Sequence, residues 1–240
     1  MQFPALKPPL TNEGRMLVAP EIDGVTADWF VPDTWGDRAV AVEVGGRGSA
    51  WFLRTDAGDL VLRHYRRGGL AGKIVERMYF YSGIYRARSF AEFQLTRELY
   101  QAALPVPRVV AAIVWPRALF WYQAAIIVER IPDAVNFPNS ADVVNGRLWR
   151  QIGQMIRRFH EWGLDHVDLN CDNILVADDV TYLIDFDRCR RRGQSSPENW
   201  QERNLKRLKR SVYKRLSSRE DLEIDRLWLH LISGYHDGIS

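Results

Sequence analysis

One stretch of the sequence decides the fold: His166-Val167-Asp168-Leu169-Asn170-Cys171-Asp172-Asn173-Ile174-Leu175-Val176-Ala177-Asp178-Asp179-Val180-Thr181-Tyr182-Leu183-Ile184-Asp185-Phe186-Asp187. It contains two apolar runs, 174–176 and 180–184, on either side of a short acidic turn. Two such runs around a polar turn predict a β-hairpin. Carboxylate and amide side chains border both runs, so the hairpin would hold a group of polar residues at its open end.

The spacing of these polar residues matches the phosphoryl-transfer pattern H-x-D-L-x-x-x-N followed by D-F-x. In that chemistry one carboxylate accepts a hydroxyl proton, while an amide and a second carboxylate hold Mg²⁺ against the nucleotide phosphates. Asp168 is the candidate base, and Asn173 and Asp185 are the candidate metal ligands. We expect His166 to brace the loop by hydrogen bonding. The alternative, that these residues only cap turns, does not account for their common register.

Length and composition allow one two-lobed domain or two small ones, since 240 residues with 46% hydrophobic content can bury a substantial core. The two cysteines, Cys171 and Cys189, do not suggest a disulfide framework, which favours a reducing compartment. We expect no signal peptide, because residues 1–9 lack an apolar core. We also expect no transmembrane helix, because a proline and an arginine interrupt the most apolar region, 109–128.

The N-terminal part of the chain predicts an antiparallel sheet, with strands at 39–44, 50–54 and 60–65. Residues 1–38 would pack their aromatic side chains against it. The turn Gly45-Gly46-Arg47-Gly48 can bring backbone N–H groups close to phosphates, because glycine has no Cβ. Gly45, Gly46 and Gly48 are therefore candidate nucleotide contacts, although an ordinary hairpin would have the same composition.

A helix is predicted from Ser89, as its N-cap, to Ala103. Glu92 lies on its apolar face, where an unpaired carboxylate would be costly to bury, and we expect Arg63 to be its partner. Arg63 also stands where kinases carry the lysine that binds the nucleotide phosphates, with Lys73 as the competing candidate. The alternatives are a surface arginine and a first-turn glutamate favoured by the helix dipole.

Strands at 109–114 and 120–128 complete the first lobe, about residues 1–130. The segment Glu129-Arg130-Ile131-Pro132 then has the character of a hinge, and Glu129 is a candidate adenine contact. The second lobe, about residues 131–240, would follow it.

The second lobe begins with an amphipathic helix, Leu148 to Phe159, which ends at Gly163. Basic residues are concentrated in two regions. Residues 66–89 combine Arg and Lys with aromatics, and residues 188–219 contain twelve Arg or Lys against two Glu, before a balanced helix at 221–232. Such regions suit an anionic membrane surface, a phosphorylated headgroup or nucleic acid. A solvated basic face is the alternative.

Taken together, these motifs resemble the 3-deoxy-D-manno-octulosonic acid (Kdo) kinases, relatives of the heptose kinases of lipopolysaccharide core synthesis. The resemblance spans roughly residues 20–235. It is carried by these segments: Gly45-Gly46-Arg47-Gly48, Val61-Leu62-Arg63-His64-Tyr65-Arg66-Arg67-Gly68-Gly69, Arg88-Ser89-Phe90-Ala91-Glu92-Phe93, residues 166–175 and Ile184-Asp185-Phe186-Asp187.

The resemblance implies an α+β, two-lobed protein-kinase-like fold, with an antiparallel N-terminal sheet, one main helix and a reduced helical C-terminal lobe, together one catalytic domain over residues 1–240. It implies transfer of the ATP γ-phosphate, with Mg²⁺, to the 4-OH of Kdo on a lipid A precursor. The enzyme would be peripheral on the cytoplasmic face of the inner membrane, with no nucleic acid and no obligate protein partner. The implied roles are base for Asp168, metal ligands for Asn173 and Asp185, and nucleotide site for Gly45, Gly46, Gly48, Arg63, Glu92 and Glu129.

The sequence departs from the kinase pattern at two positions: Asp187 replaces the glycine of D-F-G, and Arg63 replaces the lysine. No A-P-E sequence follows Asp187, which counts against a protein substrate.

Two alternatives stay open. A soluble kinase of the aminoglycoside or choline type shares a similar loop, but its acceptors are usually cationic and the dense Arg and Lys argue against them. A kinase-shaped module that binds anionic lipid or nucleic acid without catalysis is the other, although such proteins commonly lose a base or metal residue that this chain keeps.

Overall fold

The computed structural model describes residues 10–11, 14–42, 50–56, 58–65, 79–80, 87–116, 121–193 and 199–237. The chain divides into two compact units: Met1–Arg97 with Pro107–Arg130, and Glu98–Val106 with Ile131–Ser240. The glycine-rich turn 45–48, Lys73 and most of the basic, aromatic segment 66–89 lie outside the described residues.

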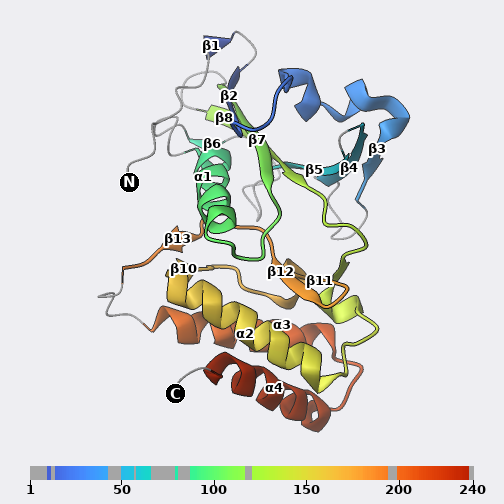
Figure 1. Ribbon diagram of the computed structural model, residues 1–240, viewed down its shortest axis with the longest axis vertical. Coiled ribbons are helices and arrows are strands. Elements are labelled where there is room, and N and C mark those ends of the chain that lie inside the picture. Colours follow the sequence, from blue (N-terminus) through green and yellow to red (C-terminus); the bar gives the residue numbers. More distant parts are fainter. Residues whose placement is uncertain are drawn as a thin grey trace. The chain divides into compact units, whose positions relative to one another are not determined.

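In the described part of the first unit, the strands form one antiparallel sheet in the order β1-β2-β7-β8-β5-β4-β3, with β6 paired to β8 (Figure 1). The strands are β1 (Leu10–Thr11), β2 (Gly14–Val18), β3 (Ala39–Ala41), β4 (Ala50–Thr55), β5 (Gly58–His64), β6 (Tyr79–Phe80), β7 (Val109–Pro116) and β8 (Trp121–Glu129). The expected strands of this lobe are confirmed, and β1, β2 and β6 were not anticipated.

Alternation along β5 sends its side chains to two different cores. Leu60 and Leu62 are buried on one face, against the aromatic rings of Phe30 and Trp35. Those rings come from two 3₁₀ segments, η1 (Ala27–Phe30) and η2 (Pro32–Arg38), so the packing expected of the aromatic lead-in is confirmed.

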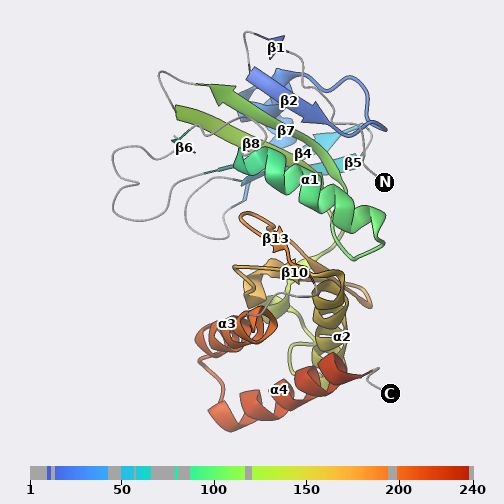
Figure 2. The same cartoon turned by 90° about the vertical axis from the view of Figure 1, so that its left-hand side faces the viewer.

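The opposite face of the sheet is covered by helix α1 (Arg88–Gln101), whose Phe90 and Phe93 are buried together with Tyr65 (Figure 2). The helix begins one residue before Ser89, so the expected N-cap role of Ser89 is wrong. Its buried hydroxyl donates instead to the Ile113 carbonyl of β7, at 3.0 Å. A tertiary hydrogen bond to the sheet has taken the place of the local cap.

Residues 98–106 belong to the second unit, which the sequence did not indicate. The Leu183 N–H donates to the Pro105 carbonyl at 3.0 Å, and the Arg158 guanidinium donates to the Ala103 carbonyl at 2.8 Å. These two bonds tie the end of α1 and the turn after it to the second unit.

The second unit contains the predicted hairpin, which is confirmed: β11 and β12 are antiparallel, with Ile174 opposite Leu183. The amphipathic helix is also confirmed, and it ends at Gly163, whose φ of 97° suits glycine. The elements are β9 (Val135–Asn136), η5 (Phe137–Asn139), α2 (Gly146–Trp162), β10 (Leu164–Asp165), η6 (Cys171–Asn173), β11 (Ile174–Ala177), β12 (Val180–Leu183), β13 (Arg190–Arg191), α3 (Trp200–Arg215) and α4 (Asp221–His236).

Helices α2 and α4 lie side by side with their backbones in close approach (Figure 1). A Cβ at Gly153 would lie 2.7 Å from the Tyr235 nitrogen and closer still to the Leu231 carbonyl oxygen, and one at Gly234 would meet the Arg150 carbonyl in the same way. The glycines therefore set the spacing of this helix pair. None of the helices in the described ranges combines the length and apolar content that a bilayer span requires.

Gly153→Ala should destabilise the protein by about 3 kcal/mol, at the upper end of overpacking effects, because the obstructing atoms are backbone. Chemical denaturation would measure the loss. The matched control is Gly193→Ala, where the new Cβ meets no described atom within 4 Å. Equal stability of the two variants would contradict the close approach of α2 and α4.

His160 on α2 is buried between aromatic rings. Its Nδ1 lies 2.8 Å from the Tyr235 hydroxyl of α4, and its ring centroid lies 5.0 Å from that of Trp200. Burial lowers the pKa of His160 from 6.5 to about 4. The native state therefore holds this imidazole neutral at pH values where the unfolded chain would protonate it.

The free energy of unfolding should fall as pH drops from about 6.5 towards 4, because His160 binds a proton in the unfolded state in this range but not in the native state. The stabilisation is complete above the unfolded pKa. In His160→Gln, the slope of unfolding free energy against pH over this window should be smaller than in the wild type, whatever the variant's absolute stability. Identical slopes would show that His160 makes no such contribution.

Candidate active site

The loop before the hairpin is folded by Asn170. Its Oδ1 accepts hydrogen bonds from the N–H groups of Asp172 and Asn173, at 2.9 and 3.2 Å, and caps the 3₁₀ turn η6. Its Nδ2 donates to the Asp168 carbonyl at 3.0 Å. A single asparagine therefore holds both halves of the loop.

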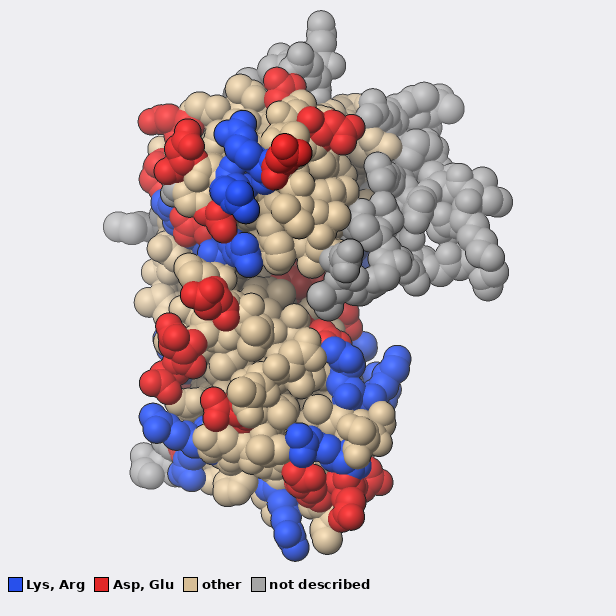
Figure 3. All heavy atoms as spheres, turned by 90° about the vertical axis from the view of Figure 1, so that its right-hand side faces the viewer, with Lys and Arg blue, Asp and Glu red and all other residues tan. Residues whose placement is uncertain are grey.

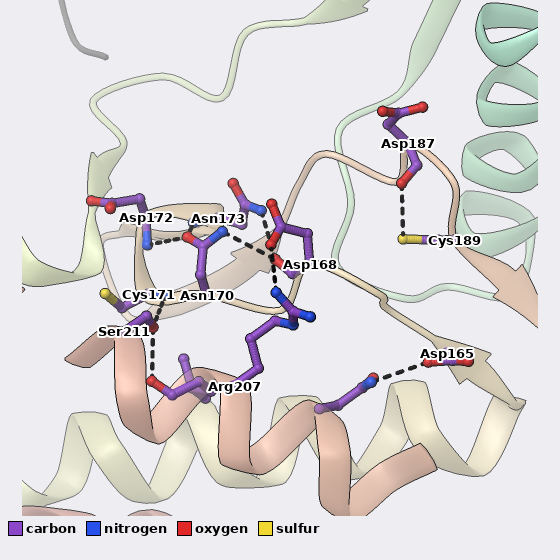
Figure 4. Close-up of polar contacts among 12 residues, drawn as sticks. Asp165, Asp168, Asn170, Cys171, Asp172, Asn173, Asp187, Cys189, Arg207 and Ser211 are labelled. Carbon is purple, nitrogen blue, oxygen red and sulfur yellow. Dashed lines mark hydrogen bonds and ion pairs between the residues drawn. The ribbon is translucent and has the colours of Figure 1, made fainter. Parts of the chain in front are cut away.

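Asp168 has a fixed backbone and an open carboxylate. Asn173 Nδ2 also donates to the Asp168 carbonyl, at 3.0 Å, so two amides hold this one peptide oxygen. The side chain is 61% exposed, and its Oδ1 lies 3.4 Å from the guanidinium of Arg207 on α3 (Figure 4). An exposed carboxylate on a braced backbone has the access that a general base needs.

Two hydrogen bonds attach the D-F segment to this loop. The Ile184 N–H donates to the Asn173 carbonyl at 3.0 Å, and His166 Nε2 lies 3.1 Å from the Ile184 carbonyl. Because a carbonyl only accepts, Nε2 carries the proton in this bond. Burial lowers the pKa of His166, so the ring stays neutral. The expected bracing role of His166 is confirmed, and it fixes the residue before Asp185.

The backbone of the D-F segment turns sharply at Asp185, whose φ of 64° lies in the left-handed region, and again at Arg188 with φ of 60°. Asp187, which replaces a glycine, does not have a positive φ. Phe186 is buried against His166, with ring centroids 5.6 Å apart. The residue at 187 therefore needs none of the conformational freedom of glycine.

Asn173 and Asp185 lie at the same end of the hairpin, and their chemistry fits Mg²⁺. The amide nitrogen of Asn173 is used by Asp168, which leaves its oxygen as the possible ligand. Over the described ranges, no three His, Cys, Asp or Glu residues are grouped to hold a metal.

In the first unit, Arg63 and Glu92 form an ion pair: Arg63 Nη2 lies 2.5 and 2.6 Å from the two carboxylate oxygens. The predicted pairing is confirmed. Glu92 is only 5% exposed and also accepts a hydrogen bond from the Tyr65 hydroxyl. Alternation along β5 sends Arg63 and Tyr65 to the α1 face, away from Leu62, so the buried carboxylate of α1 meets a cation and a hydroxyl there.

Glu129 lies at the end of β8 and pairs with Arg108, whose Nε is 2.9 Å from the carboxylate. The Glu129 N–H donates to the Arg108 carbonyl, and the Arg130 N–H donates to the Asp59 carbonyl. Neither of these two donors is available to an adenine ring in this structure.

Sequence reasoning missed the contacts between α3 and the catalytic loop. Ser211 accepts from the Cys171 N–H at 2.9 Å, and Arg215 Nε donates to Asp172 at 2.9 Å. With Arg203 and Arg207, these side chains repeat every four residues along the helix. Arg207 reaches Asp168 of the loop, and Arg203 approaches Asp165 just before it. The interval of four was visible in the sequence, but the acidic partners lie about 40 residues away and carried no local signal.

The basic block 188–219 is partly neutralised by acids of the same unit. Arg192 pairs with Asp165 at 2.9 Å, and Lys209 pairs with Asp225 at 3.0 Å. On the face shown in Figure 3, Lys and Arg side chains (blue) are interspersed with Asp and Glu side chains (red). Part of the block therefore has a structural role. Its other, exposed cations could bind an anionic partner.

Comparison with known proteins identifies the family. The model of the lipopolysaccharide kinase (Kdo/WaaP) family matches residues 33–235, which include most of both units. A relative from Xanthomonas euvesicatoria pv. vesicatoria, named 3-deoxy-D-manno-octulosonic acid kinase, is 47% identical over 208 residues, covering 85% of this chain and 82% of its own. A relative of the same name from Stenotrophomonas maltophilia is 46% identical over 211 residues, covering 87% and 84%.

Solved structures show the same fold at low identity. A structure of WaaP in complex with acyl carrier protein has a TM-score of 0.51 and 18% identity, over 93% of this chain and 92% of that one. The Rio2 kinase from Chaetomium thermophilum has a TM-score of 0.50 and 18% identity, over 86% and 69%. The predicted protein-kinase-like fold is confirmed. The chain is a phosphotransferase that belongs to the lipopolysaccharide kinase (Kdo/WaaP) family.

Proposed function

We propose that this chain transfers the γ-phosphate of ATP to the 4-OH of a Kdo sugar on a lipid A precursor during lipopolysaccharide synthesis. The observation that carries the proposal is the 44–47% identity to several proteins named 3-deoxy-D-manno-octulosonic acid kinase, over more than four-fifths of both chains. The loop geometry supports it, because base, amide and second carboxylate are all retained.

Asp168 acts as the base in this proposal. Its carboxylate accepts the proton of the acceptor hydroxyl while that oxygen forms the new bond to phosphorus and ADP leaves. Asn170 and Asn173 hold the Asp168 carbonyl, which limits the movement of the base. Asn173 and Asp185 would bind Mg²⁺, which when bound neutralises charge on the phosphates.

Arg63 contributes to binding the ATP phosphates in place of the kinase lysine, and Glu92 keeps its guanidinium in position. A planar guanidinium can share its donors between a carboxylate and a phosphate, which a lysine does as a point charge. Gly45, Gly46 and Gly48 would approach the phosphates through backbone N–H groups, and Glu129 would lie next to the adenine.

The enzyme would work as a peripheral protein on the cytoplasmic face of the inner membrane, because its acceptor is a lipid. Two exposed cations of α3, Arg210 and Lys214, could face anionic headgroups, each contributing about 1 kcal/mol of attraction near such a surface.

Asp168→Asn should lower kcat by about 10²- to 10⁴-fold, because it removes a positioned base while keeping the shape of the side chain. Transfer of labelled γ-phosphate from Mg-ATP to Kdo-bearing lipid A precursor in detergent would measure it. ATP binding should be unchanged.

The matched control is Asp179→Asn, the same change at an exposed residue in the hairpin turn. Wild-type turnover in Asp168→Asn would reject the base assignment. If the wild type bound ATP but left the Kdo acceptor unphosphorylated, the acceptor assignment would fail, and small polar acceptors would be tested next.

Arg63→Met should raise the KM for ATP about 10-fold or more, because a charged hydrogen-bond donor to phosphate is lost. It should also destabilise the first unit by about 2 kcal/mol, because Glu92 keeps only part of its pairing. Adding Glu92→Gln should restore stability but not the KM. Arg54→Met, an exposed change on β4, is the control. Recovery of both quantities in the double variant would limit Arg63 to a structural role.

A further inference from the structure

Helix α3 presents a row of side chains, one every four residues, to the catalytic loop and to Asp165 just before it. Three of them either make a short hydrogen bond or approach a buried carboxylate. Ser211 accepts from the Cys171 N–H and donates to the Leu208 carbonyl at 2.7 Å, while Arg215 lies 2.9 Å from Asp172. Arg203 approaches Asp165, a carboxylate that is 3% exposed. These contacts hold the loop on the helix.

Arg207, in the middle of this row, differs from its neighbours. Its contact with Asp168 joins one nitrogen to one oxygen at 3.4 Å, and its side chain is 44% exposed. In the part of the chain that the structure describes, Asp168 is the one hydrogen-bond or ion-pair partner of Arg207. A guanidinium has five N–H donors, so most of those on Arg207 make no hydrogen bond to a described residue, although they lie beside the proposed base.

Support of Asp168 does not explain this arrangement. A guanidinium that holds a carboxylate does so best through two parallel hydrogen bonds of about 2.7–2.9 Å. The backbone of Asp168 is already held by Asn170 and Asn173. The cation therefore has a use other than holding the base.

The acceptor has a group that Arg207 could bind. The relatives are named for an octulosonic acid, a sugar that carries a carboxylate on the same ring as its hydroxyls. The guanidinium of Arg207 reaches the Asp168 carboxylate, as Figure 4 shows for the pair, and the Arg207 side chain is 44% exposed. A ring whose carboxylate lay on Arg207 would bring a hydroxyl of the same ring towards Asp168.

We propose that Arg207 binds the carboxylate of the sugar-acid acceptor and positions the reacting hydroxyl at Asp168. This assignment rests on the proposed function and names the group in the acceptor that the site recognises. Because a guanidinium matches a carboxylate through two hydrogen bonds, lysine is an incomplete substitute. Recognition of the acceptor therefore depends on the guanidinium at position 207 more than on the net charge of helix α3.

The test pairs a change in the protein with a change in the acceptor. Two acceptors are used, the Kdo-bearing lipid A precursor and the same precursor with the Kdo carboxylate converted to a primary amide. Wild type, Arg207→Gln and Arg207→Lys are assayed with saturating Mg-ATP for kcat and for the KM of each acceptor. Arg226→Gln, the same charge change at an exposed residue of α4, controls for general attraction to the anionic acceptor.

The wild type should prefer the acid over the amide by about 10²-fold in kcat/KM, the size expected for hydrogen bonds between charged groups. Arg207→Gln should lose about that factor on the acid and almost nothing on the amide. The kcat/KM of Arg207→Lys on the acid should lie between those of the wild type and Arg207→Gln. The KM for ATP should stay constant, and Arg226→Gln should keep the wild-type preference.

Equal losses on both acceptors in Arg207→Gln would overturn the assignment, because Arg207 would then act on Asp168 and not on the carboxylate. Equal use of acid and amide by the wild type would overturn it as well. Absence of transfer to either acceptor by the wild type would reject the proposed function and the assignment with it. Transfer without coupling between Arg207 and the carboxylate rejects the assignment alone.

Discussion

The second unit depends on the buried carboxylate of Asp165, which precedes the catalytic loop by one residue. It is 3% exposed and accepts hydrogen bonds from Arg192 at 3.0 Å and from Asn204 at 3.1 Å. Asn204 in turn accepts from the His166 N–H at 3.0 Å. An unpaired carboxylate at this depth would be costly, so the chain after the D-F segment and helix α3 must both come to it. Neither partner performs chemistry, yet together they fix where the loop begins.

Short-range signals predicted much of the catalytic stretch. The hairpin follows from two apolar runs around a turn, and the bracing histidine follows from the loop pattern, since all the partners lie within about twenty residues. Glu92 was assignable for a different reason. A carboxylate on an apolar helix face requires a cation, and Arg63 stood on a strand that the sheet would place nearby.

The features that the sequence did not predict depend on long-range contacts. Ser89 has the character of an N-cap, but its hydroxyl bonds to Ile113, 24 residues away. The basic block indicated an anionic partner, and no pattern could show that Arg192 and Arg215 were already committed to Asp165 and Asp172. Residues 98–106 comprise the last turn of helix α1 and the segment after it, and hydrogen bonds from distant residues tie them to the second unit. In each case the deciding partner lies too far along the chain for periodicity to show it.

The backbone at Asp187 bears on how such enzymes diverge. In the kinase pattern the third position of D-F-G is a glycine, yet here the left-handed turns fall at Asp185 and Arg188 instead. A position without that backbone requirement is open to drift among many residue types. A search for kinases by the letters D-F-G would therefore pass over this chain, whereas a search for left-handed turns at positions 185 and 188 would find it.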